Sequence, residues 1–122
     1  MESRFAGIGI TLVIIAALVG YKFMQKGDRA EEIRQQVMTQ LEALPDFETH
    51  ALLYTTWFDA HHDTIFEQHF HMGGRRVPAR FDGDEYIHDL FTAMVVDATA
   101  AGYEEQADRL RELGDSLYIE SE

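Results

Sequence analysis

The sequence predicts a mainly α-helical protein, with one N-terminal transmembrane helix followed by a small acidic helical domain. Three observations support this prediction. Residues 5–21 carry no charged side chain, apolar residues recur at helical spacing through most of the following chain, and nearly all acidic residues lie in that second part. We therefore expect an anchor over residues 1–27 and a domain over residues 28–122, which is long enough for one core and too short for two.

The uncharged stretch has the length of a membrane-spanning helix. Extended over residues 5–24 it would span about 30 Å as a helix, the thickness of the hydrocarbon layer of a bilayer. A cleaved signal peptide needs a basic leader and a cleavage site between small residues, whereas here Glu2 offsets Arg4 and no such site follows. We expect an uncleaved anchor that contacts membrane lipid. Its predicted lipid-facing residues are Phe5, Ile8, Ile10, Leu12, Val13, Ile14, Ile15, Leu18 and Val19.

Basic residues on the two sides of the anchor predict its orientation. Arg4 precedes the apolar stretch, whereas Lys22, Lys26 and Arg29 follow it. Flanks rich in lysine and arginine stay on the cytoplasmic side. We therefore expect a single-pass membrane protein whose acidic domain lies in the cytoplasm.

The charge of the domain bears on its partners. Residues 28–122 contain 21 acidic residues and seven arginines, a formal net charge of −14. A field of this sign repels phosphate groups, which argues against nucleic acid and anionic lipid as partners. It would suit a basic protein partner, multivalent cations or high salt, and an ordinary solvated acidic surface is the alternative. The sequence contains no cysteine, which excludes disulfides and thiolate metal sites within it.

Caps and stops delimit the first soluble helix. Its apolar residues recur at helical spacing through Leu44, Asp28 can cap its start, and Pro45 ends it because the residue before a proline avoids the helical conformation.

Two further helices are predicted near the C-terminus. Asp82 can cap the first, with Glu85 three residues later, and Gly102 suits the left-handed residue that follows a helix. The second helix begins near Tyr103 and is expected to end at Gly114. We expect the two helices to pair as an antiparallel hairpin.

Residues 46–81 have two interpretations. As a helix, the segment would be capped by Asp46, would present a broad apolar face, and would end near His71 before Gly73 and Gly74. As strands, it would turn at the two glycines and return along residues 75–81. We prefer the helix, and an α+β fold with a hairpin within residues 50–81 is the alternative.

Histidine and carboxylate side chains are concentrated in this segment. On a helix, several of them lie four residues apart on one stripe, where a divalent cation would offset the repulsion between the carboxylates. Imidazole together with carboxylate suits zinc, iron or manganese. A divalent metal ion is therefore a possible cofactor, and ordinary structural roles are the alternative. The candidate ligands are Asp59, His62, Asp63, Glu67, His69 and His71.

Aromatic and arginine side chains are the candidate contacts to a protein partner, because these residue types are enriched at interface hot spots. A role in the core is the alternative for the aromatic residues. For the arginines we expect pairing with the acidic helices of the same domain, with a phosphate or lipid head group as the alternative. The candidates are Tyr54, Trp57, Phe58, Arg75, Arg76 and Arg80.

The sequence contains no nucleophile elbow, no phosphate-binding glycine loop and no zinc-protease helix. We therefore expect a membrane-anchored accessory or adaptor protein whose domain binds another membrane or membrane-associated protein, as a subunit of a larger complex. The alternative is a membrane-tethered domain that binds a divalent metal ion, with or without enzymatic activity.

Overall fold

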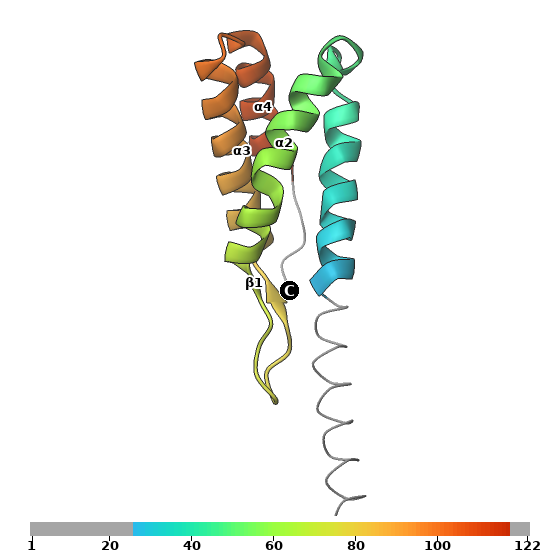
Figure 1. Ribbon diagram of the computed structural model, residues 1–122, viewed down its shortest axis with the longest axis vertical. Helices are drawn as coiled ribbons and strands as arrows, with labels where there is room; N and C mark the ends of the chain where they lie inside the picture. Colours follow the sequence, from blue (N-terminus) through green and yellow to red (C-terminus); the bar gives the residue numbers. More distant parts are fainter. Residues whose placement is uncertain (1–25, 118–122) are drawn as a thin grey trace, which may run out of the picture.

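The structure, a computed structural model, describes residues 26–117. These residues form four helices and one short hairpin (Figure 1), which confirms the mainly helical prediction for this part of the chain. In chain order the elements are the helix 26–42, α2 (Phe47–His69), β1 (Phe70–His71), β2 (Arg80–Phe81), α3 (Gly83–Ala100) and α4 (Glu104–Ser116).

The predicted anchor, residues 5–24 with all nine lipid-facing side chains, lies outside the described residues. Within residues 26–117, no helix combines the length and the apolar character that crossing a bilayer requires.

The first described helix differs from its prediction at both ends. Lys26 and Gly27 are already helical, so Asp28 lies inside the helix and does not cap it. The helix ends at residue 42, two residues before Leu44, and a turn that contains Pro45 leads into α2.

Residues 46–81 combine the two interpretations. The preferred helix is correct through His69, and the hairpin alternative is correct for two residue pairs, in which Phe70 lies opposite Phe81 and His71 opposite Arg80. Residues 72–79 connect the strands, so the turn is longer than the two glycines predicted. Gly73 has a φ of +73°, and a Cβ there would overlap the backbone carbonyls of Val77 and Pro78, because the loop folds back on itself.

The two C-terminal helices pair as predicted. The Asp82 carboxylate accepts a hydrogen bond from the backbone N–H of Glu85 at 3.4 Å, and Gly102 adopts a φ of +86° after α3. The predicted end at Gly114 is wrong, because α4 continues to Ser116. A Cβ at Gly114 would lie 2.8 Å from the Cβ of Phe91, so this glycine allows close contact between α3 and α4.

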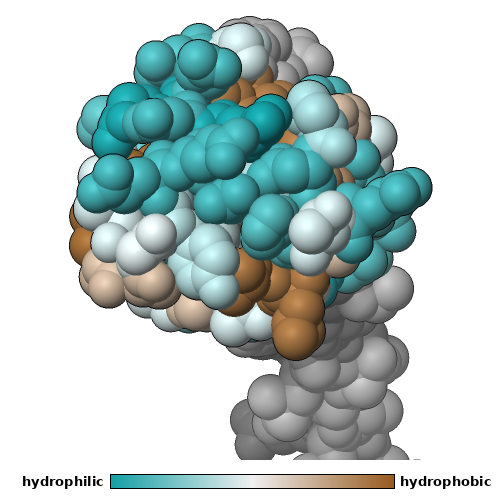
Figure 2. Space-filling view, turned by 90° about the horizontal axis from the view of Figure 1, so that it is seen from above, coloured by the Kyte–Doolittle hydropathy of each residue, from teal (hydrophilic) through white to brown (hydrophobic). Residues whose placement is uncertain are grey.

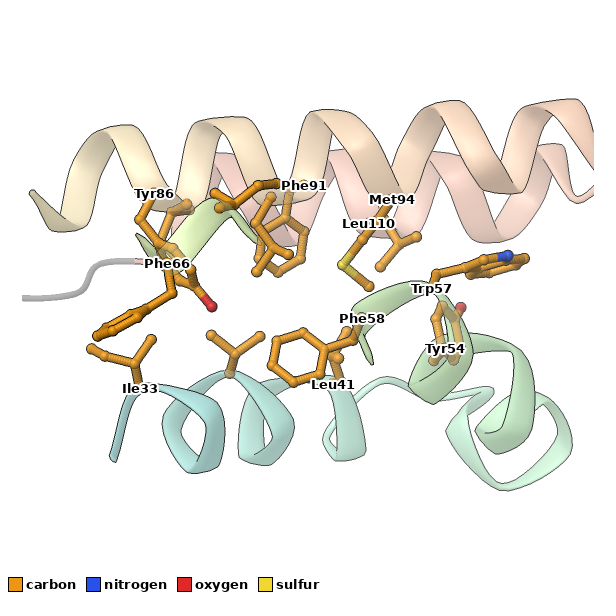
Figure 3. Packing of buried hydrophobic residues seen from close by; sticks show 14 of the residues in the cluster. Ile33, Leu41, Tyr54, Trp57, Phe58, Phe66, Tyr86, Phe91, Met94 and Leu110 are labelled. Atoms are coloured by element: carbon orange, nitrogen blue, oxygen red, sulfur yellow. The ribbon is translucent and has the colours of Figure 1, made fainter. Parts of the chain in front are cut away.

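Aromatic side chains fill the core between the helices (Figure 3). Phe66 is 2% exposed, and its ring stacks on the rings of Phe70 and Phe81 at 5.3 Å each. The helix 26–42 covers this cluster with fully buried aliphatic side chains, among them Ile33 and Leu41. The core therefore joins all four described helices through residues far apart in the sequence.

Candidate functional site

Two of the predicted metal ligands are paired with bases of the helix 26–42. The carboxylate of Asp59 lies 2.6 Å from the guanidinium of Arg34, and that of Glu67 lies 2.6 Å from the ammonium of Lys26. Asp63, between them on the helix, is exposed. The carboxylates of Asp59 and Glu67 therefore connect α2 to the helix 26–42.

Two histidines of α2 meet aspartates of α3 in matching positions. His61 Nε2 lies 2.6 Å from Asp97 Oδ2, and His69 Nε2 lies 2.7 Å from Asp89 Oδ2. The two histidines are eight residues apart, as are the two aspartates, so both pairs connect the same faces of the antiparallel helices. His61 was not among the predicted ligands. Its pairing with Asp97 becomes apparent only when α2 and α3 are placed side by side.

Three of the six candidate ligands, Asp59, Glu67 and His69, thus pair with residues outside the predicted set, whereas His62 Nε2 lies 3.9 Å from Asp63 Oδ1. His71 is exposed in β1, apart from the helical stripe. Within residues 26–117, no three histidine or carboxylate side chains are arranged to hold a metal ion. Metal binding stays a prediction, which metal analysis of the gently purified chain checks.

His62 lies inside the core and is 2% exposed. Its ring stacks on Phe58 at 4.9 Å, and its Nδ1 lies 2.6 Å from the hydroxyl oxygen of Tyr86. Burial lowers the pKa of His62, although the nearby Asp63 carboxylate acts in the opposite direction, and burial raises the pKa of Tyr86 above its usual value. We infer that the Tyr86 hydroxyl donates to a neutral imidazole.

We expect His62 to make stability depend on pH. Below an ordinary histidine pKa of 6.5, the unfolded chain takes up a proton that the folded domain resists, so the free energy of unfolding should fall by up to about 1.4 kcal/mol per pH unit. His62→Asn offers Tyr86 an acceptor that does not titrate, and should reduce this slope. Denaturant titrations of the full chain in mild detergent at pH 7.5 and 5.5 measure it. The exposed His71→Asn is the control, and equal slopes in both variants would contradict the prediction.

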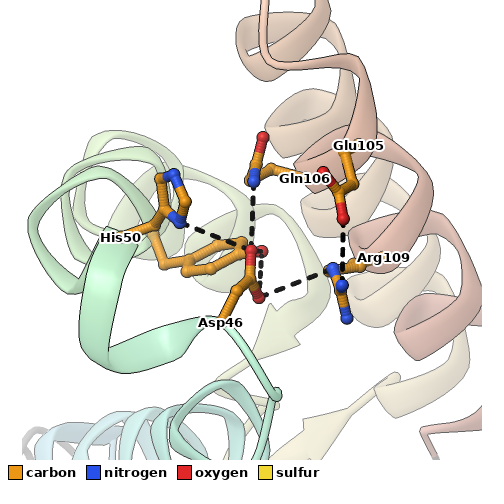
Figure 4. Close-up of polar contacts among 6 residues, drawn as sticks. Asp46, His50, Glu105, Gln106 and Arg109 are labelled. Atoms are coloured by element: carbon orange, nitrogen blue, oxygen red, sulfur yellow. Dashed lines mark hydrogen bonds and ion pairs between the residues drawn. The ribbon is translucent and has the colours of Figure 1, made fainter.

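Asp46 is the polar centre of a contact between the start of α2 and α4 (Figure 4). Both of its carboxylate oxygens lie 2.9 Å from the Tyr54 hydroxyl, which donates to them, and Gln106 Nε2 donates to Oδ2 at 3.1 Å. Arg109 Nε and His50 Nδ1 lie 3.7 and 3.5 Å from the carboxylate. Asp46 precedes α2, as predicted, but its side chain makes no capping hydrogen bond to the helix. The prediction of a capping side chain is therefore wrong.

The pKa of Asp46 reflects this environment. Burial alone would raise it, but the hydrogen bonds from Gln106 and Tyr54 and the charge of Arg109 lower it below its ordinary value. The carboxylate is thus held charged, and it joins two elements that are 60 residues apart in sequence.

The predicted aromatic partner contacts lie inside the domain. Tyr54 and Phe58 are fully buried, and Trp57 is almost so. Trp57 packs edge-on against Tyr54 and Tyr103, at 5.8 and 5.7 Å. The alternative given for these residues, a role in the core, is what the structure describes.

The predicted arginine contacts lie on the hairpin and are exposed. Arg75 and Arg76 belong to the connecting loop, and Arg80 lies in β2. The expected pairing with acidic helices is wrong for the described part of the chain, because none of the three forms an ion pair with a carboxylate of residues 26–117.

A groove of about 270 Å³ lies between α3 and α4. Apolar side chains of α3 and charged side chains of α4 line it. Val96, at its edge, is 60% exposed, although it is a large apolar residue. No sequence pattern predicted this groove, because its two sides belong to different helices. Its lining residues include Ile87, Phe91, Val95, Val96, Arg111 and Asp115.

The chain matches no protein-family model, and comparisons with curated proteins and with solved structures found no similar protein. Its function is therefore inferred from its own residues.

Proposed function

We propose that the chain is a single-span membrane protein whose acidic helical domain binds another membrane-associated protein, as an accessory subunit of a larger complex. The observation that carries the proposal is the groove between α3 and α4 with exposed Val96 at its edge. The apolar stretch of residues 5–24 supports the anchor, and only Gln25 separates Met24 from Lys26, which is already helical. The domain would therefore sit close to the membrane, with its soluble part facing the cytoplasm.

The occupant we propose for the groove is an amphipathic helix of the partner, with apolar residues on one face and basic residues beside them. Half-buried Val95 and exposed Val96 supply apolar contacts of the kind that receive such a face, and the buried side chains of Ile87 and Phe91 lie beneath them. The domain carries a formal net charge of −14, which would attract basic flanks and speed their association. The histidine and carboxylate residues of α2, by contrast, already connect helices within the domain.

The proposal predicts that Val96→Asp weakens partner binding by about tenfold or more, since a charge in an apolar contact costs at least the 1.4 kcal/mol that this factor represents. The full chain is extracted from native membranes in mild detergent, and proteins that co-purify in fixed ratio are measured by mass spectrometry. A photo-crosslinking residue at position 96 should attach to the same protein.

Leu52→Asp is the matched control, because Leu52 is also a large apolar residue, 80% exposed, on a different helix. The Leu52→Asp variant should still bind the partner. A photo-crosslinking residue at position 52 should not attach to it. A chain that purifies without a stoichiometric partner, or a Val96→Asp variant that retains it, would overturn the proposal.

A further inference from the structure

We propose that the hairpin tip, residues 72–80, binds the phosphate head groups of anionic phospholipids on the membrane that the anchor crosses. This inference rests on the proposed function, because it requires residues 5–24 to span that membrane. It adds a second lipid contact, on a surface whose local charge is opposite to the net charge of the domain.

The tip holds the arginines that the domain leaves without a neutralising carboxylate. The side chains of Arg75, Arg76 and Arg80 are exposed and form no ion pair with any carboxylate of residues 26–117. Arginine presents forked N–H donors that match phosphate oxygens. Every other arginine of the described residues lies beside a carboxylate, in the pairs Arg29–Glu32, Arg34–Asp59, Arg109–Glu105 and Arg111–Asp108.

The tip itself carries no acidic residue, and the nearest ones in sequence are Glu67, which is paired with Lys26, and Asp82, Asp84 and Glu85 at the start of α3. Residues 68–81 contain three arginines, two histidines and no carboxylate, within a domain that holds 21 acidic residues. At the opposite end of the domain, hydrophilic side chains cover most of the face seen in Figure 2. That end includes the first turn of α4, with Glu104 and Glu105. Since α3 separates the two ends by about 27 Å and charges are screened over about 10 Å, the distal acids would not cancel attraction at the tip.

The hairpin lies at the end of the domain where the helix 26–42 begins (Figure 1). The ammonium of Lys26 lies 2.6 Å from Glu67 in the last turns of α2, and the guanidinium of Arg29 lies 5.5 Å from the ring centre of Phe81 in β2. Because only Gln25 lies between the apolar stretch and Lys26, a bilayer crossed by that stretch would face the tip.

The tip also carries apolar surface suited to a membrane interface. Val77 is 60% exposed, and Pro78 beside it is exposed as well. Arginines followed by an exposed apolar pair resemble the composition of interfacial elements, which place apolar groups between head groups and bases near phosphates. The tight turn at Gly73 holds this arrangement, since a Cβ there would meet the carbonyls of Val77 and Pro78.

The experiment uses single cysteines in the full chain, which has none of its own. A fluorescent label is placed at Ile15→Cys in the predicted anchor, at Val77→Cys in the tip, or at Thr99→Cys at the distal end of α3. Each protein is reconstituted into vesicles of phosphatidylcholine alone or mixed with phosphatidylglycerol, with a quencher attached to the lipid. The labels at positions 15 and 77 should be quenched in the mixed vesicles, and the label at position 99 should not.

Replacing Arg75, Arg76 and Arg80 by glutamine should weaken the tip contact by about fivefold for each arginine and return the label at position 77 to its state in phosphatidylcholine. Salt at about 1 M should have the same effect, because it shortens the screening length to about 3 Å. Arg111→Gln, which removes one positive charge from an exposed site on α4, is the control and should leave the quenching at position 77 unchanged.

Two results would overturn the inference, and they are distinguishable. If the label at position 15 is quenched while that at position 77 behaves like that at position 99, the anchor is in the membrane and the tip does not touch it. If the label at position 15 is not quenched, the proposed span fails, and the tip contact fails with it. Quenching at position 77 that persists in the triple variant would show that arginine–phosphate contacts do not hold the tip.

Discussion

Replacing Phe66 with alanine is expected to lower the free energy of unfolding of the domain by about 3–5 kcal/mol, the usual cost of deleting a buried phenylalanine ring. Phe66 is 2% exposed and contacts the rings of Phe70 and Phe81 by stacking and that of Tyr86 edge-on. Its loss would open a cavity where α2, the hairpin and α3 meet. Since a small domain has about 5–15 kcal/mol of stability, the variant should be close to unfolding.

Thermal unfolding of the full chain in mild detergent, followed by circular dichroism, measures this effect. Leu52→Ala is the matched control on the same helix, because Leu52 is 80% exposed and its truncation should change stability by no more than about 0.5 kcal/mol. Equal melting temperatures for the two variants would show that Phe66 does not hold the elements together.

Asp46→Ala is expected to cost about 2–4 kcal/mol, because it leaves the buried hydroxyl of Tyr54 and the amide of Gln106 without their acceptor. The variant also removes the carboxylate that faces Arg109. Asp108→Ala, which breaks only an exposed pair with Arg111, should cost less than about 1 kcal/mol. Denaturant titration of both variants in the full chain makes the comparison.

The effect of Asp46 should also depend on pH. Its folded-state pKa is lowered, so its stabilisation is present above the ordinary value of 3.8 and is lost as the pH falls through the folded-state value. The difference between wild type and Asp46→Ala should therefore shrink in acid. A difference that stayed constant to low pH would indicate that the charge of the carboxylate contributes nothing.

Local signals predicted much of the helical framework. Asp82 and Gly102 act as a helix start and a helix end because such roles depend on the residue and its immediate neighbours. Gly114 was misread for the same reason, since its contact is with Phe91 on another helix. A glycine chosen for close packing and a glycine chosen to end a helix look alike in sequence.

The functional features depended on contacts that sequence periodicity does not reveal. Asp46 has the position of a cap, yet its acceptor capacity is used by Tyr54 and by Gln106, 60 residues away. The arginines of the hairpin were expected to meet acidic helices because acids dominate the composition, but β1 and β2 carry them beyond those helices. The composition gives the net charge of the domain, whereas the distance between the hairpin arginines and the acidic helices depends on the fold.

The paired histidines and aspartates of α2 and α3 limit how the two helices can slide along each other. His61 meets Asp97 and His69 meets Asp89 at equal spacings of eight residues, a little over two turns. A displacement of one turn in either direction would bring an alanine, Ala93 or Ala101, opposite His61. Among the observed register and the two registers shifted by one turn, only the observed one brings both imidazoles opposite an aspartate. The two polar pairs therefore favour a single alignment of α2 and α3. A uniformly apolar interface would allow several alignments.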